Sequence, residues 1–343
     1  MKNASQRMTA SLSLLGLALG IALAIQLGAV SITGADWLAV LTAHDDAPLK
    51  GSAYVLWNIR VPRALCAVLI GAALGVSGAL TQGLFRNPLA DPGLLGVTSG
   101  AACAAALTIV VFAGMQLSIP IEWRIWVLPM ASFLGAFAVC LTLDRVARWL
   151  IPGSIAGLLL TGIALNALAM AVMGLCTYLA TDEQLRSLSF WTLGSVAGTN
   201  WSHAALLTVI LVFALLRIQR LLNPLNALAL GQSTAGHLGI NITQLRTEII
   251  LLVALLSGIS IAWCGLIGFI GLIAPHIVRT WLGSNQKHVV PFSAVVGAGL
   301  LLLADTVART IAIPAEIPVG IFTALLGAPF FLVLLNRARH KMI

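Results

Sequence analysis

Long, uninterrupted apolar segments constrain this chain more than any other feature of its sequence. A helix needs about 20 apolar residues to cross the hydrocarbon core of a bilayer. Windows of this length, separated by polar residues or by Pro and Gly, recur throughout the 343 residues. They predict ten membrane-spanning helices, near residues 10–32, 63–85, 94–115, 125–144, 153–179, 203–220, 246–264, 265–282, 290–308 and 318–336.

The composition agrees with an all-α polytopic membrane protein. Hydrophobic residues make up 59% of the chain and charged residues 9%, whereas roughly a quarter of the residues are charged in soluble domains. Because the apolar segments are continuous and do not alternate with polar residues, the pattern excludes a membrane β-barrel. The spans occupy nearly the whole chain, so we expect a single membrane domain over residues 1–343.

The basic residues indicate how the chain is oriented. An even number of spans places both termini on the same side of the membrane, and both termini are basic. If that side is the cytoplasm, 13 of the 19 Lys and Arg residues lie inside, as the positive-inside rule requires. The net charge of +8 then follows from topology and indicates no nucleic-acid partner. The basic residues left outside are Lys50, Arg60, Arg63, Arg124, Arg186 and Arg309.

The residues needed for catalysis within this chain are missing. A P-loop requires a Lys after a glycine, and none of the lysines follows one. A membrane enzyme or a proton-driven transporter would need ionisable clusters deep in the membrane, but Asp144, Glu248 and Asp305 lie near span ends. The five cysteines show no metal-binding spacing. We therefore expect no catalytic site, no metal and no disulfide.

Four stretches of the sequence resemble motifs of one transporter family and occur in the same order as in that family. They are IRVPRAL (59–65), GALTQGLFRNPLADPGLLGVTSGAA (78–102), GLIGFIGLIAPHIVR (265–279) and LLLADTVARTIAIPAEIPVGIFTALLGAPFFL (301–332). Together they resemble the permease subunit of type II ATP-binding-cassette (ABC) importers of the FecCD type, which take up haem, ferric siderophores and vitamin B12. The resemblance implies a homodimer in the bacterial inner membrane, with both termini in the cytoplasm, two cytoplasmic ATPase subunits and a periplasmic substrate-binding protein.

Within this family the chain looks most similar to haem permeases. The resemblance lies in FRNPLADPGLLG, GIALNAL, DEQLRSLSFWTLGS and PAEIPVG. It implies ATP-driven import of haem from periplasm to cytoplasm by alternating access. The permease would bind no cofactor, since ATP and Mg are used by the partner ATPase. A ferric siderophore is the alternative cargo, and cobalamin is less favoured.

Three arginines are candidates for docking the binding protein. The resemblance assigns Arg60 and Arg63, in an Arg-x-x-Arg motif, and Arg309 to contacts with acidic residues of that protein. Guanidinium groups form directional pairs with carboxylates and speed the encounter of oppositely charged surfaces. The alternative is that the arginines reach lipid headgroups or pair with the local acids Asp305 and Glu316.

The polar interval between spans six and seven is a candidate coupling segment. Asn223 and Pro224 are expected to end the sixth span, Gly231 and Gly239 to end short helices, and Ser233 to cap the second of these. Two short helices could seat in a groove of another protein. The resemblance implies ATPase coupling at about 223–245, whereas an interfacial loop is the alternative. The expected coupling residues are Leu228, Leu230, Gly231, Ser233, His237, Leu238 and Gly239.

The fifth span is a candidate for the translocation pathway, because the family lines its conduit with this span. Asn166 is its one strongly polar residue deep in the membrane, and it either faces the conduit or bonds to an adjacent helix. His276 follows Pro275 in the family motif, where a hydrogen bond at a broken helix is expected rather than haem ligation. Residues 182–201 are expected to form a short external helix.

Overall fold

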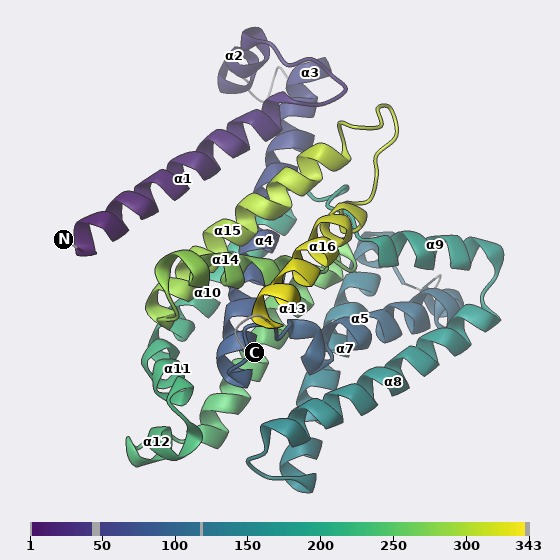
Figure 1. The fold of residues 1–343 in the computed structure, drawn as a ribbon. Helices are drawn as coiled ribbons and strands as arrows, with labels where there is room; N and C mark the ends of the chain where they lie inside the picture. The colour runs from purple at the N-terminus through teal and green to yellow at the C-terminus, as the bar shows by residue number, and fades with distance from the viewer. Residues whose placement is uncertain (1, 43–48, 117–118, 340–343) are drawn as a thin grey trace.

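The computed structural model describes residues 2–42, 49–116 and 119–339, and this part of the chain contains helices and no strand (Figure 1). Six helical runs are long and apolar enough to cross a membrane, and four shorter apolar helices accompany them. These helices fall on the ten predicted spans, which confirms the all-α architecture. They are α1 (Lys2–Gln26), α4 (Val61–Phe85), α5 (Val97–Ala106), α7 (Ile121–Leu150), α8 (Ile155–Leu179), α10 (Trp201–Ile218), α13 (Ile242–Cys264), α14 (Ile270–Leu282), α15 (Gln286–Ala308) and α16 (Val319–Arg339).

Shorter helices lie between the spans, and four of them lie at opposite ends of the molecule. In Figure 1, α2 and α3 lie at one end of the molecule, and α11 and α12 lie at the opposite end. The predicted helix between the fifth and sixth spans is present as α9, and a capping box of Thr181 and Gln184 begins it. The short helices are α2 (Gly34–Thr42), α3 (Gly51–Tyr54), α6 (Ala113–Gln116), α9 (Asp182–Leu193), α11 (Leu222–Ala229) and α12 (Gln232–His237).

The second span begins earlier than predicted, and this difference changes the setting of its arginines. Helix α3 continues through a π-helical turn at Val55–Arg60 into α4, which gives one helical run from Gly51 to Phe85. Pro62 has no amide hydrogen to donate, and the wider turn before it accommodates the missing bond. Arg60 and Arg63 therefore lie inside a continuous helix rather than at its mouth.

The sixth span also extends beyond its predicted end. Its helical run continues from Trp201 to Ala229, because Pro224 lies in the first turn of α11, where no amide hydrogen is needed. The seventh and eighth spans, which the sequence leaves adjacent, are separated by a short non-helical segment. Gly265 and Phe269 both have positive φ angles there, of 67° and 66°, so α13 ends and α14 begins anew.

Helix α4 is the centre of the bundle, and glycines allow its neighbours to approach it closely. Gly71 and Gly75 of α4 face Gly297 and Ser293 of α15, and Gly78 faces the backbone of α14. A Cβ atom at any of these three α4 glycines would lie less than 3.0 Å from a backbone carbonyl oxygen. Backbone contact of this kind is the main attractive force available between helices in lipid, where apolar burial alone gives little.

We expect Gly297→Ala to lower the melting temperature of the purified protein. The added methyl group would collide with the α4 backbone, and overpacking of this kind costs about 1–3 kcal/mol. Gly299→Ala is the matched control on the same helix, because open space surrounds that position and alanine favours a helix by roughly 0.5–1 kcal/mol. Equal melting temperatures for the two variants in detergent would contradict the close contact.

Candidate functional site

The three predicted docking arginines lie together at the end of the bundle that carries α2 and α3. Arg60 donates to the backbone carbonyls of Ile25 (3.1 Å) and Gln26 (2.9 Å), and also to that of Val30. Arg309 donates to the backbone carbonyl of Ala24 in α1 and to that of Leu27, just after the helix. The last carbonyls of a helix lack partners within it and carry partial negative charge. The two arginines therefore cap the C-terminal end of α1.

Arg63 makes a different set of contacts, all with carboxylates. Its Nη2 lies 2.9 Å from Oδ1 of Asp305, and its Nη1 lies 2.9 Å from Oε2 of Glu316. Asp305 is shared, since its Oδ2 lies 3.7 Å from Nε of Arg309. These ion pairs join the beginning of α4 to the end of α15 and the segment after it. The pairing with Asp305 and Glu316, kept as the alternative in the sequence analysis, is thus confirmed, while docking stays a prediction.

We call Arg60, Arg63, Asp305, Arg309 and Glu316 the arginine cluster. It contains three guanidinium groups and two carboxylates, which leaves one positive charge in excess. The three arginines and Glu316 line a cavity of ≈ 140 Å³. Burial lowers the pKa of Arg309 below its usual value, against the opposing effect of Asp305. The cluster can therefore receive an acidic side chain at this end of the bundle.

Gly28 belongs to this site although the sequence offered no signal for it. It has a φ of 147°, and a Cβ atom there would lie 2.6 Å from Nη2 of Arg60 and 3.1 Å from Nη1 of Arg309. Only glycine lets the chain pass between the two guanidinium groups in this conformation. The residue is recognisable only after α1, α4 and α15 are placed together.

The predicted coupling segment forms two short helices at the opposite end of the molecule (Figure 1). Leu225 and Leu228 of α11 are buried, whereas Leu230 is 72% exposed and Leu238 is 64% exposed. The apolar side chains thus divide into an anchored pair and a pair that projects from the chain. Exposed leucines at a helix end are suited to contact with a partner protein.

The ends of these two helices agree with the prediction except at Ser233. Gly231 and Gly239, with φ angles of 122° and 80°, follow α11 and α12 as predicted. Gly231 occupies the N-cap of α12, and Ser233 lies within the helix, so the prediction that Ser233 caps it is wrong. His237 is the last residue of α12. A glycine fits the N-cap because no side chain is required there and its φ is unusual.

Asn226 holds the coupling segment to α15 and was missed by the sequence analysis. Its Nδ2 donates to Oδ1 of Asn285 (2.9 Å), and its Oδ1 accepts from the backbone amide of Gln286 (2.8 Å). These residues begin α15, whose other end carries Asp305. The segment is therefore attached directly to a helix that reaches the arginine cluster.

Asn166 in the fifth span makes hydrogen bonds within the chain. Its Nδ2 donates to the carbonyl of Gly93 (3.3 Å), and its Oδ1 accepts from the hydroxyl of Ser99. Of the two roles left open by the sequence, bonding to an adjacent helix is confirmed. A role in the translocation pathway stays a prediction.

Histidines and cysteines form no recognisable metal centre in the part of the chain that the structure describes. No group of three or more His, Cys, Asp or Glu side chains converges there. All five cysteines are free, and four of them are buried, as expected for small core residues. The ring of His276 lies edge-on to that of Phe330, with centroids 6.0 Å apart.

Comparison with known proteins identifies the family of this chain. The model of the FecCD transport family matches residues 16–337. The chain belongs to the FecCD transport family. Its curated relatives include the hemin transport system permease protein HmuU of Yersinia pestis, 41% identical over 332 residues that cover 96% of both chains. The vitamin B12 import system permease protein BtuC of Pectobacterium atrosepticum is 39% identical over 306 residues, covering 89% of this chain and 88% of that one.

Solved structures agree with this assignment. The fold matches an inward-facing conformation of a metal-chelate type ABC transporter with a TM-score of 0.80 and 32% identity, covering 95% of this chain and 97% of that one. A second match, PsaBC from Streptococcus pneumoniae, has a TM-score of 0.54 at 15% identity and supports the fold alone. The chain is therefore a multi-pass ABC importer permease, and the resemblance found in its sequence is confirmed.

We expect Asp305→Asn to destabilise the protein far more than Glu316→Gln. Loss of the Asp305 carboxylate leaves two buried guanidinium groups short of a partner, and removing one member of a buried ion pair costs about 3–5 kcal/mol. The Glu316 side chain is 46% exposed, and exposed pairs contribute only about 0–1 kcal/mol. Thermal unfolding in detergent measures both. A smaller effect for Asp305→Asn would contradict the cluster's structural role.

Proposed function

We propose that this protein is the permease of an importer that carries haem from the periplasm to the cytoplasm. The observation that supports it most is the 41% identity to the hemin permease over nearly the full length of both chains. Vitamin B12 permeases match at 38–40% identity over 285–328 residues. A ferric siderophore is the second candidate cargo, favoured by the structural likeness to a metal-chelate type transporter.

The transporter would contain two copies of this chain, two ATPase subunits and a periplasmic binding protein. We place it in the bacterial inner membrane, with both termini in the cytoplasm, because this orientation puts most basic residues inside. An 18-residue apolar stretch of α8 and one of the helical run that contains α10 are each only 22% buried within the chain. Apolar helix faces that the chain leaves uncovered are available to a second copy or to lipid.

The arginine cluster would receive an acidic side chain of the binding protein. Arg63 is already paired with two carboxylates, so it contributes little free charge. Arg60 donates only to uncharged backbone carbonyls, and its positive charge is not neutralised. We therefore assign the main attraction for a carboxylate to Arg60, with Arg309 beside it in the same cavity.

The coupling segment would transmit the movement of the ATPases. Closing of the ATPases on ATP and Mg would displace α11 and α12 through the exposed Leu230 and Leu238. The bonds from Asn226 to the start of α15 would carry this displacement into the bundle. The permease itself would hold no cofactor. Its role is to alternate access to the pathway, which α8 would line with mostly apolar side chains.

A reconstituted transport assay tests the function directly. We expect proteoliposomes that contain the permease and its ATPase to accumulate haem when ATP and the haem-loaded binding protein are supplied. Ferric siderophore and cobalamin, each loaded in the same way, should accumulate at less than about a tenth of that rate, because differences of about 1.4 kcal/mol suffice for tenfold discrimination. Preferred uptake of either competitor would show that the transporter carries that compound instead of haem.

Arg60→Gln should weaken binding of the periplasmic protein to reconstituted permease about tenfold or more, because a buried charge pair is lost. Glutamine can still donate to the α1 carbonyls, which limits structural damage. Arg186→Gln, on the exposed surface of α9, is the charge-matched control and should bind as the unmodified protein does. Unchanged affinity for Arg60→Gln, measured by surface-immobilised nanodiscs, would remove this residue from the docking site.

Replacing both exposed leucines of the coupling segment, Leu230→Ala with Leu238→Ala, should reduce ATPase stimulation by the loaded binding protein. If truncating the two side chains removes about 2 kcal/mol of binding free energy at the interface, the affinity for the ATPase falls about 30-fold. The matched control is Trp149→Ala with Leu150→Ala at the exposed end of α7. Full stimulation in the Leu230/Leu238 variant would exclude contact through these residues.

A further inference from the structure

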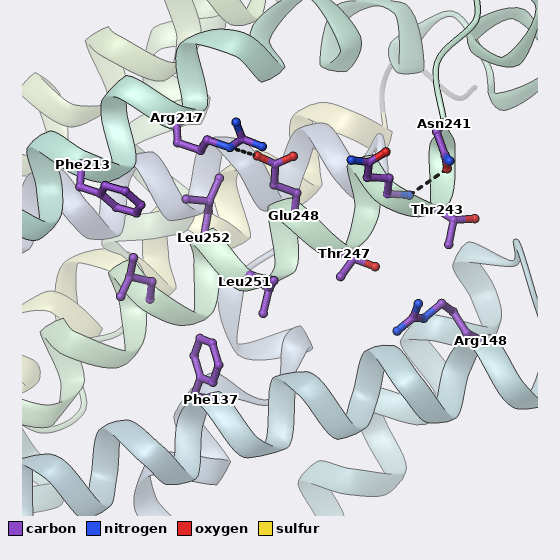
Figure 2. Close-up of a pocket in the computed structure, with 12 residues that line it drawn as sticks. Phe137, Arg148, Phe213, Arg217, Asn241, Thr243, Thr247, Glu248, Leu251 and Leu252 are labelled. Carbon is purple, nitrogen blue, oxygen red and sulfur yellow. Dashed lines mark hydrogen bonds and ion pairs between the residues drawn. The ribbon is translucent and has the colours of Figure 1, made fainter.

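An open groove lies between α7, α10 and α13, at the end of the bundle that carries α11 and α12 (Figure 2). Its volume is ≈ 720 Å³. Arg148 at the end of α7, Arg217 at the end of α10 and Asn241 before α13 line its polar part. Phe137, Phe213 and leucines of α13 line the part that lies deeper along the helices. The groove thus combines a charged mouth with an apolar floor.

Two of the three helices that form this groove, α7 and α10, are mostly uncovered within the chain, whereas α13 belongs to the core. An 18-residue apolar stretch of α7 is 17% buried within the chain and one in the run that contains α10 is 22% buried, compared with 72% for α13 and 83% for the run that contains α4. Phe137 on α7 and Phe213 on α10 flank Leu251 and Leu252 of α13 in Figure 2. An apolar surface at this depth in a membrane helix is available to acyl chains.

The mouth of the groove exposes more positive than negative charge. Arg148 pairs with Asp144 at 2.9 Å, and Arg217 pairs with Glu248. The guanidinium side chains are 39% and 43% exposed, whereas the carboxylate side chains are 2% and 19% exposed. Asp144 is also shared with the buried Arg246 at 3.5 Å. The carboxylates are buried more deeply than the guanidinium groups that they hold in place. The surface presented to a ligand is therefore cationic.

We propose that the groove binds one anionic phospholipid from the leaflet on this side of the membrane. Its phosphate lies at the mouth of the groove, where the exposed guanidinium group of Arg148 or of Arg217, which lie on opposite sides of it (Figure 2), can form charge-assisted bonds. Gln244 and Thr243 supply further polar groups at the mouth. The acyl chains follow the apolar floor past Phe137 and Phe213. This site adds to the transport function and does not depend on the cargo.

The site has a mechanical consequence because of the helix it contacts. Helix α13 follows the coupling segment directly, and Gln244, Thr247 and Glu248 in its first turns line the groove. A lipid held there packs α13 against α7 and α10 near the point where α12 leads into it. The bound lipid therefore contacts the bundle close to the coupling segment.

Native mass spectrometry of the purified full chain tests the proposal. Detergent-solubilised protein is mixed with equal amounts of phosphatidylglycerol and phosphatidylcholine, and the bound lipid is counted. We expect one phosphatidylglycerol to be retained in preference to phosphatidylcholine. Arg148→Gln with Arg217→Gln should weaken its binding about 25-fold, at about fivefold for each arginine near an anionic headgroup.

Two further variants keep the test decisive. Arg145→Gln with Arg220→Gln removes the same charge from exposed arginines of the same helix ends that do not line the groove, and it should retain the lipid. Leu251→Trp fills the floor without changing charge and should reduce binding of the lipid, which covers the case in which the double arginine variant fails to fold.

Three outcomes would overturn the proposal. Equal retention of the two lipids would show that the groove does not select negative charge. Equal losses in the two double arginine variants would assign the effect to general surface charge. Retention by the monomer but not by the dimer would show that a second copy of the chain covers the groove.

Discussion

The close backbone contact of α4 with α14 and α15 is the constraint on which the rest of the structure depends. Gly71, Gly75 and Gly78 leave no space for a Cβ atom against the facing carbonyls, so α4 can occupy the centre of the bundle only with glycine at these positions. In lipid, where helices gain little by burying apolar surface, this contact replaces the hydrophobic core of a soluble protein. It also fixes the position of α4 along α14 and α15.

The arginine cluster follows from that placement. Once α4 is central, Arg60 and Arg63 are buried and need partners, because an uncompensated charge is costly away from water. The end of α1 supplies carbonyls, and Asp305 of α15 supplies a carboxylate. The same α15 begins beside Asn226 of the coupling segment. A single helix pair thus connects the two ends at which we propose the binding protein and the ATPase act.

The sequence predicted the ten helices because apolar length is a local property, and it predicted the family because four motifs are contiguous stretches. Two predicted helix boundaries were wrong because the helix continues through a proline. A π-helical turn accommodates Pro62, and Pro224 lies in the first turn of α11. The capping of α1 by Arg309 could not be predicted, since its partner Ala24 lies 285 residues away. Gly28 carried no signal because its neighbours Arg60 and Arg309 are also distant in the sequence. The pairing of Arg63 with Asp305 and Glu316 was one of two alternatives that only the arrangement of the helices could decide.

The opposite locations of the two ends can be tested by labelling single introduced cysteines with a membrane-impermeant thiol reagent. Ile311→Cys lies beside the arginine cluster and Leu238→Cys at the end of α12, and both positions are 64% exposed. We predict that Ile311→Cys reacts in intact spheroplasts and Leu238→Cys only in inverted membrane vesicles, above the background of the native cysteines. Reaction of both from the same side, or with the sides reversed, would contradict a permease that meets its binding protein outside and its ATPase inside.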